Sequence, residues 1–328
     1  MSGYSGLYLI KNKSFVRLKP DRQIKERCER KLEKENPKRV IIGASGLIGG
    51  ELYTQLQKKN LHPIGTYTTN FQPGLSYFNL LENNFSFLEG LSSRDTLFLM
   101  SAYSNPNWIS DNKALALELN LSKTKDLIDF CVDRGVKVIF MSSVEVFDGT
   151  KGSYTEFDDV NPLNFYGELK AQVEDYIKEN AHKYLIVRTG WNVGFVPKRR
   201  CVVSLTYNSI LKQDAHMAFD NYFSIADVGD TARGLFLASI RDEIKVLHLC
   251  STEIVNRFDL ATKIKIESRR SNEMAFKKCT FEEIEYSEPR GRINDLSNNL
   301  SRKVLDIYYA SADDIISKKI EYLDEQNS

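Results

Sequence analysis

The 328-residue chain lacks the long apolar runs that membrane proteins need and carries almost no net charge. No uninterrupted apolar stretch approaches the ~18 residues of a membrane-spanning helix, so we expect no membrane span. The N-terminus has no apolar core followed by a cleavage site, and we therefore expect a cytoplasmic protein. The formal net charge is only +1, and we expect no nucleic-acid partner.

Cysteine and histidine are scarce and scattered. The five cysteines show no spacing typical of a metal or redox site, and we expect reduced thiols. The four histidines form no cluster, so no metal site is predicted, and His248 lies in an apolar run where a core or turn role is expected. Hydrophobic residues at 42% and charged residues at 27% are ordinary for a globular protein with one large or two small domains.

A glycine-rich segment is the first motif with chemical content. Residues 40–42 are typical of a buried parallel strand, and residues 51–59 are typical of a helix. The glycines between them are three residues apart, which allows a tight turn and lets phosphates approach the positive end of the helix dipole. We therefore predict a dinucleotide site rather than a purely structural turn. The predicted contact residues are Gly43, Ser45, Gly46, Leu47, Ile48 and Gly49.

The second predicted strand, residues 62–67, does not end in the carboxylate that usually binds the ribose of NAD. Thr66 and Tyr67, which are predicted cofactor contacts, are followed by Thr68 and Thr69. Neutral hydroxyls tolerate a 2′-phosphate, although no arginine stands in this stretch to bind one. The sequence therefore favours NADP as cofactor, and NAD stays possible.

A serine pair and a Tyr-x-x-x-Lys sequence suggest catalytic groups. Ser142 and Ser143 follow a predicted strand at residues 136–141, and open α/β sheets bind ligands at the carboxyl ends of their strands. Tyr166 and Lys170 share one helix face, where the ammonium would lower the pKa of the phenol. Such a tyrosine exchanges protons with a carbonyl or alcohol oxygen. We favour catalysis over the alternative of ordinary turn and helix residues.

Five segments resemble the extended short-chain dehydrogenase/reductases, and most closely their dTDP-4-dehydrorhamnose reductase group. They read GASGLIG, SSVEVFDG, NPLNFYGELKAQVE, RTGWNVG and DNYFSIADVGDTA, and they spread across most of the chain. The resemblance implies Ser143, rather than Ser142, as the catalytic hydroxyl, Tyr166 as acid/base and Lys170 as its partner. It also implies that Trp191 lines a sugar site and that Asn120 shapes a proton relay.

The resemblance implies further contacts outside these segments. Arg290 is expected to touch a nucleotide diphosphate, with Arg292 as the competing candidate. The basic residues 197–200 either meet the same diphosphate or form an exposed loop, and both interpretations stay open. The remaining cofactor contacts that the resemblance implies are Asn79, Leu80, Ser101 and Ala102.

The departures from the family pattern lie on the substrate side. Val144 and Glu145 replace an Asp-Tyr pair, and Asn221, Phe223 and Ile225 replace the glutamine, glycine and proline of a later segment. The catalytic and cofactor residues match the pattern, whereas the sugar pocket is altered. The sequence therefore does not identify the sugar, its nucleotide or the product stereochemistry.

Alternating strand and helix patterns predict an α/β fold, a Rossmann-type doubly wound parallel sheet with a small interleaved C-terminal lobe. Residues 38–190 are the expected NAD(P)-binding core. Residues 191–328 are mainly the substrate-binding lobe, with residues near 220–250 returning to the core. One long helical stretch is expected over residues 107–134.

The first 37 residues lie outside the family resemblance. Residues 1–38 hold eleven basic and five acidic residues, a net charge of +6. Residues 7–10 and 15–18 predict a hairpin, and residues 21–35 predict a charged helix. A solvated extension is the favoured interpretation, and a docking element for a partner is the alternative.

The predicted activity is NAD(P)H-dependent reduction of a keto group, expected at C4, on a nucleotide-linked sugar, in polysaccharide or related sugar biosynthesis. One alternative is an epimerase or dehydratase that retains NAD. Another is a non-catalytic regulatory subunit that binds NADP. The expected partner is a nucleotide-sugar substrate, and a homodimer is possible.

Overall fold

A seven-stranded parallel sheet forms the centre of the computed structural model, which describes residues 7–11, 14–18, 37–196 and 201–326. The strand order is β12-β8-β7-β6-β3-β4-β5, and every neighbouring pair is parallel. This order confirms the predicted doubly wound α/β fold, since the chain runs outward in both directions from β3. The strands are β3 (Arg39–Ile42), β4 (Ile64–Tyr67), β5 (Ser76–Tyr77), β6 (Thr96–Leu99), β7 (Lys137–Met141), β8 (Tyr184–Thr189) and β12 (Val246–Leu249).

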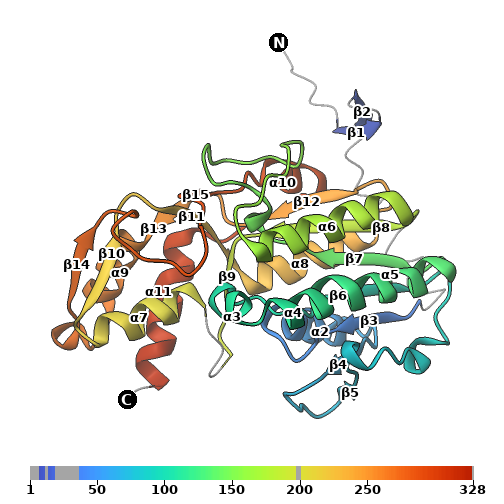
Figure 1. Ribbon diagram of the computed structural model, residues 1–328, viewed down its shortest axis with the longest axis horizontal. Coiled ribbons are helices and arrows are strands. Elements are labelled where there is room, and N and C mark those ends of the chain that lie inside the picture. The colour runs from blue at the N-terminus through green and yellow to red at the C-terminus, as the bar shows by residue number, and fades with distance from the viewer. Residues whose placement is uncertain (1–6, 12–13, 19–36, 197–200, 327–328) are drawn as a thin grey trace.

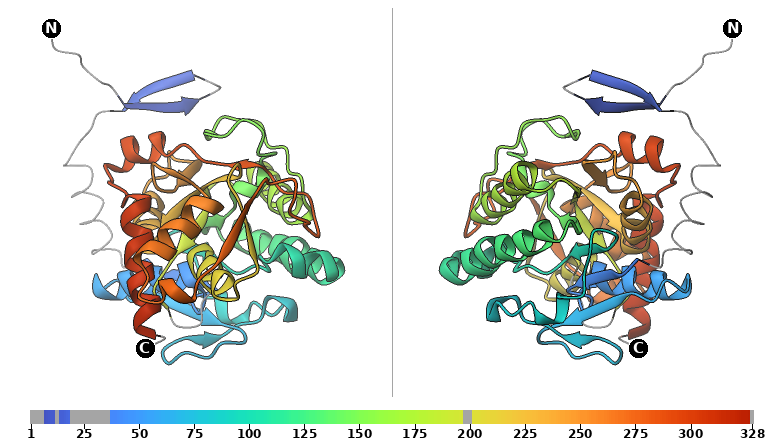
Figure 2. Two further views of the ribbon diagram at one scale, coloured as in Figure 1. Left: turned by 90° about the vertical axis from the view of Figure 1, so that its left-hand side faces the viewer. Right: turned by 90° about the vertical axis from the view of Figure 1, so that its right-hand side faces the viewer.

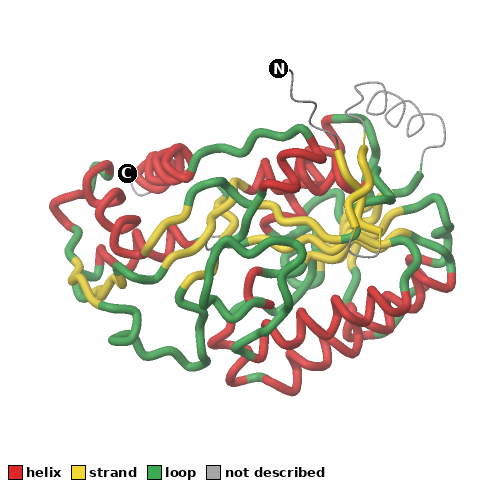
Figure 3. Tube along the Cα trace, turned by 90° about the horizontal axis from the view of Figure 1, so that it is seen from above, coloured by secondary structure: helices red, strands yellow, loops and turns green. Residues whose placement is uncertain are grey.

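Helices cover both faces of this sheet (Figures 1, 2 and 3). One face packs against α2 (Leu47–Lys58), α8 (Val228–Ser239) and α10 (Asn299–Leu305). The other packs against α3 (Pro106–Asp111), α4 (Lys113–Leu117), α5 (Thr124–Asp133) and α6 (Phe165–Asn180).

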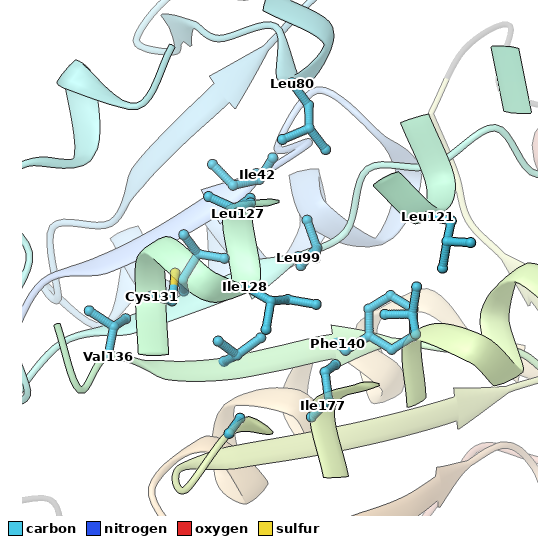
Figure 4. Close-up of a cluster of buried hydrophobic side chains, with 14 of the residues drawn as sticks. Ile42, Leu80, Leu99, Leu121, Leu127, Ile128, Cys131, Val136, Phe140 and Ile177 are labelled. Atoms are coloured by element: carbon cyan, nitrogen blue, oxygen red, sulfur yellow. The ribbon is translucent and has the colours of Figure 1, made fainter. Parts of the chain in front are cut away.

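Apolar side chains on both surfaces of the central strands explain this layering. All residues of β3 and β7 are buried, as expected for strands with continuous β-branched and aliphatic sequence. Figure 4 shows the core on the α5 side, where Leu127 and Ile128 pack over Leu99 and Phe140 of the sheet. Burying such a side chain stabilises the fold by about 1.5–3 kcal/mol.

The stretch expected to be helical over residues 107–134 is helical, but it is divided into α3, α4, a π-helical segment and α5. The backbone at Asn112 leaves helical geometry, with φ −129° and ψ 42°, and separates α3 from α4. A π-helical segment, η3 (Glu118–Lys123), then interrupts the path between α4 and α5. Such widened turns often mark functional positions, and this one buries Asn120 at its centre.

A smaller body stands beside the carboxyl ends of the main strands (Figure 1). Its sheet pairs β11 with β13, β15 and β9, and a second pair joins β10 to β14. Its core is the cluster that includes Tyr207, Ile225 and Ile315. The elements are β9 (Trp191–Val193), α7 (Val202–Leu211), β10 (Ala215–Ala218), β11 (Tyr222–Asp227), β13 (Ile254–Asn256), α9 (Arg257–Glu267), β14 (Phe276–Cys279), β15 (Ile293–Asn294) and α11 (Ala312–Gln326).

The two bodies are interleaved along the chain. Helix α8 and strand β12 lie between β11 and β13 in sequence, yet they pack on and within the main sheet. Short helical turns complete the path: η1 (Leu80–Glu82), η2 (Ser86–Leu88), η4 (Val144–Val146) and η5 (Ser271–Glu273).

Two strands lie in the segment where an N-terminal hairpin is predicted. Strands β1 (Leu7–Lys11) and β2 (Ser14–Leu18) pair antiparallel. The helix expected over residues 21–35 and the basic residues 197–200 lie outside the described residues. Within the described ranges, the model holds no helix with the length and apolarity to span a bilayer.

Candidate active site

The glycine turn between β3 and α2 is built as a tight backbone cradle. Gly43 has a φ of +91°, which favours glycine, and its N–H donates to Thr66 Oγ1 at 3.1 Å. A side chain at Gly49 would place its Cβ 2.4 Å from the oxygen of Gly43. Helix α2 begins after Gly46 with no side chain capping its first N–H groups. The turn therefore offers backbone donors and a helix dipole to an anion.

Most of the predicted turn residues lie on one cleft. This cleft has a volume of about 570 Å³ and opens at the carboxyl ends of the main strands. The predicted cofactor contacts on its wall are Gly43, Gly46, Leu47, Ile48, Gly49 and Ala102. Ser101 lies against Gly43, and its buried hydroxyl has no hydrogen-bond partner in the described part of the chain. A buried polar atom without a partner is consistent with a ligand group at this point.

The other predicted cofactor residues lie away from the cleft wall. Thr66 is buried and braces the turn, and the Ser45 N–H donates to the Thr66 carbonyl at 3.2 Å. Asn79 caps η1 by accepting from the Leu81 N–H. Leu80 is part of the main core. Tyr67 stands edge to face with Phe71 and Tyr77.

Tyr166 and Lys170 lie one turn apart on α6, and both line the cleft. Asn164 caps this helix, because its side-chain oxygen accepts from the Gly167 N–H at 2.9 Å. Lys170 donates to the Met141 carbonyl at the end of β7 at 2.8 Å. The tyrosine is only 9% exposed and the lysine 5%. The fold therefore fixes both groups at the end of the sheet.

Ser143 and Ser142 differ in how their hydroxyls are engaged. Ser142 donates to Glu174 at 2.6 Å and is buried. The Ser143 oxygen caps η4 by accepting from the Glu145 N–H at 3.2 Å, and its hydroxyl lies close enough to Tyr166 to lower the pKa of the phenol. The Ser143 hydroxyl therefore lies with the phenol, whereas that of Ser142 serves the buried network.

The electrostatics of Tyr166 run opposite to the expectation from the sequence. Burial raises the pKa of this phenol above its ordinary value, and the Glu145 carboxylate raises it further, while the Ser143 hydroxyl lowers it. Lys170 is not among the causes. Burial lowers the pKa of Lys170 itself to about 7, and Glu174 acts in the opposite direction. Tyr166 is therefore held as the protonated acid, ready to donate.

A buried ion pair supports this helix from behind. Arg188 of β8 binds Glu174 through two bonds, Nε to Oε1 at 2.9 Å and Nη2 to Oε2 at 2.6 Å. Glu174 is one turn beyond Lys170 on α6 and also accepts from Ser142. The pair thus ties the helix that carries the tyrosine to two central strands.

The cleft also carries aromatic and cationic groups. Trp191 and Arg290 line it, as predicted. Arg290 donates to Asn107 at 3.1 Å, and its buried Nε has no hydrogen-bond partner within the described ranges. Arg292 instead pairs with Asp220 at 2.7 Å and is exposed. Of these two candidates, the geometry therefore favours Arg290.

The sequence analysis did not predict that Arg257 lies close to Trp191. Its guanidinium lies 5.5 Å from the Trp191 ring centre and donates to Thr206 at 3.0 Å. Arg257 begins α9 and belongs to no motif, so nothing in the sequence indicates this approach. Asn120 was expected to shape a proton relay. Its amide pairs with the backbone N–H and C=O of Tyr103 at 2.9 and 2.8 Å, which fixes the cleft wall after Ala102.

Other titratable groups have structural surroundings. His248 is fully buried in β12, as expected, and its ring nitrogen lies 3.1 Å from the Tyr154 carbonyl. Burial lowers the pKa of His248 to about 3. Among the residues that the model describes, no group of three His, Cys, Asp or Glu is placed to hold a metal ion.

Comparison with known proteins gives a family and several relatives. A family model described as RmlD substrate binding domain matches residues 38–318. Methionine adenosyltransferase 2 subunit beta from Bos taurus is 26% identical over 243 residues, which cover 70% of this chain and 71% of that protein.

Two solved structures show how far the fold is shared. A dTDP-4-dehydrorhamnose reductase from Clostridium acetobutylicum superimposes with a TM-score of 0.75 at 25% identity, covering 89% of this chain and 100% of that one. The reductase from Bacillus anthracis, solved in complex with NADP, gives 0.72 at 21% identity and covers 86% and 98%. The second likeness concerns the fold alone.

Proposed function

Because the chain belongs to the family described as RmlD substrate binding domain, we propose that it is an NADPH-dependent reductase of a keto group on a nucleotide-linked sugar. One observation carries the proposal. A single cleft of about 570 Å³ is lined both by the glycine turn and by Ser143, Tyr166 and Lys170. Cofactor and proton donor would therefore meet at one point.

The cofactor fits the residues present. The cradle of Gly43 and Gly49 leaves room that a Cβ would fill, and α2 presents uncapped N–H groups to a pyrophosphate. No carboxylate follows β4, where Thr68 and Thr69 stand, and this supports NADP over NAD. When bound, NADPH supplies the hydride that adds to the carbonyl carbon.

The chain's own groups complete the reduction. Tyr166 gives its phenolic proton to the carbonyl oxygen, so that the ketone becomes a secondary alcohol. Ser143 holds that oxygen and stabilises the charge that develops on it. Lys170, fixed by the Met141 carbonyl, is placed to orient the site and would bind the nicotinamide ribose when the cofactor is present.

The opposite end of the cleft suits a nucleotide sugar. Trp191 provides an apolar ring surface against which a sugar packs. Arg290 offers an unpartnered Nε to a diphosphate, and such contacts are charge-assisted. We expect Arg290→Ala to raise KM for a nucleotide sugar at least tenfold, and the matched Arg292→Ala to leave it within about twofold.

The test begins with fluorescence titrations of the full chain with NADPH and NADH. Cofactor oxidation is then followed with a panel of 4-keto nucleotide sugars. Tyr166→Phe should keep NADPH affinity and lower kcat by about 10²–10⁴-fold, the contribution of a positioned general acid. Tyr176→Phe, which removes a surface hydroxyl from the same helix, is the control. An unchanged rate in Tyr166→Phe would refute the assignment.

A second candidate is a regulatory subunit. The observation that favours it is the likeness, over 70% of the chain, to a protein named as subunit beta of methionine adenosyltransferase 2. In that case the chain would bind NADP and a methionine adenosyltransferase catalytic subunit. Size-exclusion chromatography of the full chain with that enzyme, with and without residues 1–36, tests this. Tight NADPH binding, no cofactor oxidation and co-elution would favour this candidate over the reductase.

A further inference from the structure

The carboxylate of Glu145 lies on the cleft wall beside the catalytic groups, and the proposed mechanism does not use it. Glu145 belongs to η4, two residues after Ser143, and its N–H donates to Ser143 Oγ at 3.2 Å. Its carbonyl packs against the first turn of α6. A Cβ added to Gly167, the residue next to Tyr166, would lie 2.0 Å from that carbonyl oxygen. This close backbone contact fixes the position of Glu145 relative to the helix turn that carries Tyr166.

Two neutral amides hold this carboxylate. Asn164 donates to Oε2 at 2.7 Å, and Asn294 donates to Oε1 at 3.4 Å. Neither Lys nor Arg forms an ion pair with Glu145 in the described part of the chain. Two carboxylate oxygens accept about four hydrogen bonds, so acceptor positions are left for a group that enters the cleft.

Glu145 holds the side chain of Asn164, which caps α6, but this role does not require a negative charge at residue 145. A glutamine amide would accept the same bond, whereas a partly buried carboxylate without a cation is costly. The charge also faces the phenol, where it opposes loss of the Tyr166 proton. Its cost would be offset by a ligand group that donates to it.

The rest of the cleft indicates what kind of ligand this is. Arg290 stands on the same wall with an unpartnered Nε and provides a cationic position for an anion. The cleft therefore has an anion-binding group and an anionic acceptor beside the reacting groups. A sugar nucleotide matches this polarity, because its phosphates are anionic and its ring carries donors next to the carbonyl.

We propose that Glu145 is a specificity residue, which accepts a hydrogen bond from a hydroxyl or amine on the carbon next to the carbonyl that Tyr166 protonates. This inference rests on the proposed reductase function and names its substrate class. The substrate is a keto sugar with a free donor beside the ketone. Sugars that are deoxygenated at that carbon leave the carboxylate unpaired and are poor substrates.

The experiment compares three probes in NADPH oxidation: dTDP-4-dehydrorhamnose, its 3-deoxy analogue and its 3-amino-3-deoxy analogue. For the wild type, we expect kcat/KM to be about 10–100-fold lower with the 3-deoxy probe than with the better of the other two, as for a lost bond to a charged group. Of the two donor-bearing probes, the one with the higher kcat/KM identifies the preferred donor as a hydroxyl or an amine. Equal kcat/KM with the 3-deoxy probe would overturn the inference and leave the reductase assignment intact.

Glu145→Gln removes the charge and keeps an amide oxygen for Asn164. It should reduce the preference for the donor-bearing probe to less than about threefold while NADPH affinity is retained. Glu168→Gln, a charge-matched change at an exposed position on the first turn of α6, should keep the wild-type preference. A full preference in Glu145→Gln would overturn the inference.

A binding measurement tests the role of Glu145 even if the protein proves not to be a reductase. If no probe oxidises NADPH, calorimetry with dTDP-rhamnose and its 3-deoxy analogue replaces the rate. Tighter binding of dTDP-rhamnose by the wild type, lost in Glu145→Gln, would support the donor site without turnover. Equal binding of the two compounds, or binding of neither, would overturn it.

Discussion

Removing the Glu174 carboxylate is expected to destabilise the protein far more than any surface change on the same helix. Its side chain is 0% exposed and that of Arg188 is 2% exposed. Both carboxylate oxygens are engaged, by Arg188 Nε and Nη2 and by Ser142. Glu174→Gln would leave a buried guanidinium facing an amide N–H₂ group. Breaking a buried pair in this way costs about 3–5 kcal/mol of unfolding free energy.

The magnitude is checked by equilibrium urea unfolding followed by circular dichroism. The midpoint should fall with little change in the slope, because the surface exposed on unfolding is nearly constant. The double variant Glu174→Gln with Arg188→Met removes both charges and should recover at least half of the loss. Glu168→Gln is the exposed control and should stay within about 0.5 kcal/mol of the wild type.

Two outcomes would refute the reasoning. A cost below about 1 kcal/mol for Glu174→Gln would mean that the pair is solvated in solution. A double variant less stable than the single one would mean that packing of the Arg188 stem, rather than the uncompensated charge, determines the loss.

Three further predictions follow from local geometry. Gly49→Ala places a Cβ 2.4 Å from the Gly43 oxygen, so NADPH affinity in a fluorescence titration should fall at least tenfold. Gly167→Ala collides with the Glu145 carbonyl at 2.0 Å and should lower both melting temperature and kcat; an unaffected kcat would contradict the placement of Tyr166. Burial lowers the pKa of Lys170 from 10.5 to about 7, so between these pH values the folded protein binds fewer protons at this residue than the unfolded chain does. The contribution of Lys170 to the free energy of unfolding should therefore rise with pH, by up to about 1.4 kcal/mol per pH unit between pH 7 and 10.5. Lys170→Met should lose that slope in urea unfolding at several pH values.

The family resemblance drawn from five short segments is confirmed by the family match over residues 38–318. The fold was predictable because short apolar runs, separated by helical patterns, mark the central strands in the sequence. The strands expected over residues 40–42, 62–67 and 136–141 correspond to β3, β4 and β7. Their apolar character is local information, since strands buried on both faces need no alternation.

Helix interruptions were less predictable. Apolar and polar residues alternate with helical periodicity throughout residues 107–134, and no residue in this stretch indicates a π-helical segment. At the interruption, Asn120 pairs with both backbone groups of Tyr103, a contact across seventeen residues of sequence. Tertiary contact overrides local propensity here.

The direction of the Tyr166 pKa was likewise beyond the sequence. Four-residue spacing places the lysine near the phenol, but it does not report burial. Burial and the Glu145 carboxylate raise the pKa of the phenol, and Lys170 donates instead to the Met141 carbonyl. A sequence pattern gives proximity along a helix, whereas the dielectric surroundings depend on everything that packs against it.

The sequence by itself determined the parallel sheet and the glycine turn, because periodicity and spacing along one segment specify these features, and the family resemblance added the prediction of a Ser-Tyr-Lys set. Only the tertiary structure showed that Ser142 is engaged by the buried network, that Arg290 rather than Arg292 lines the cleft, and where Glu145 and Arg257 lie. Those choices depend on contacts between segments such as Ser142 with Glu174 and Arg292 with Asp220. Contacts between residues that are far apart in the chain form only once the chain has folded and its segments have packed together.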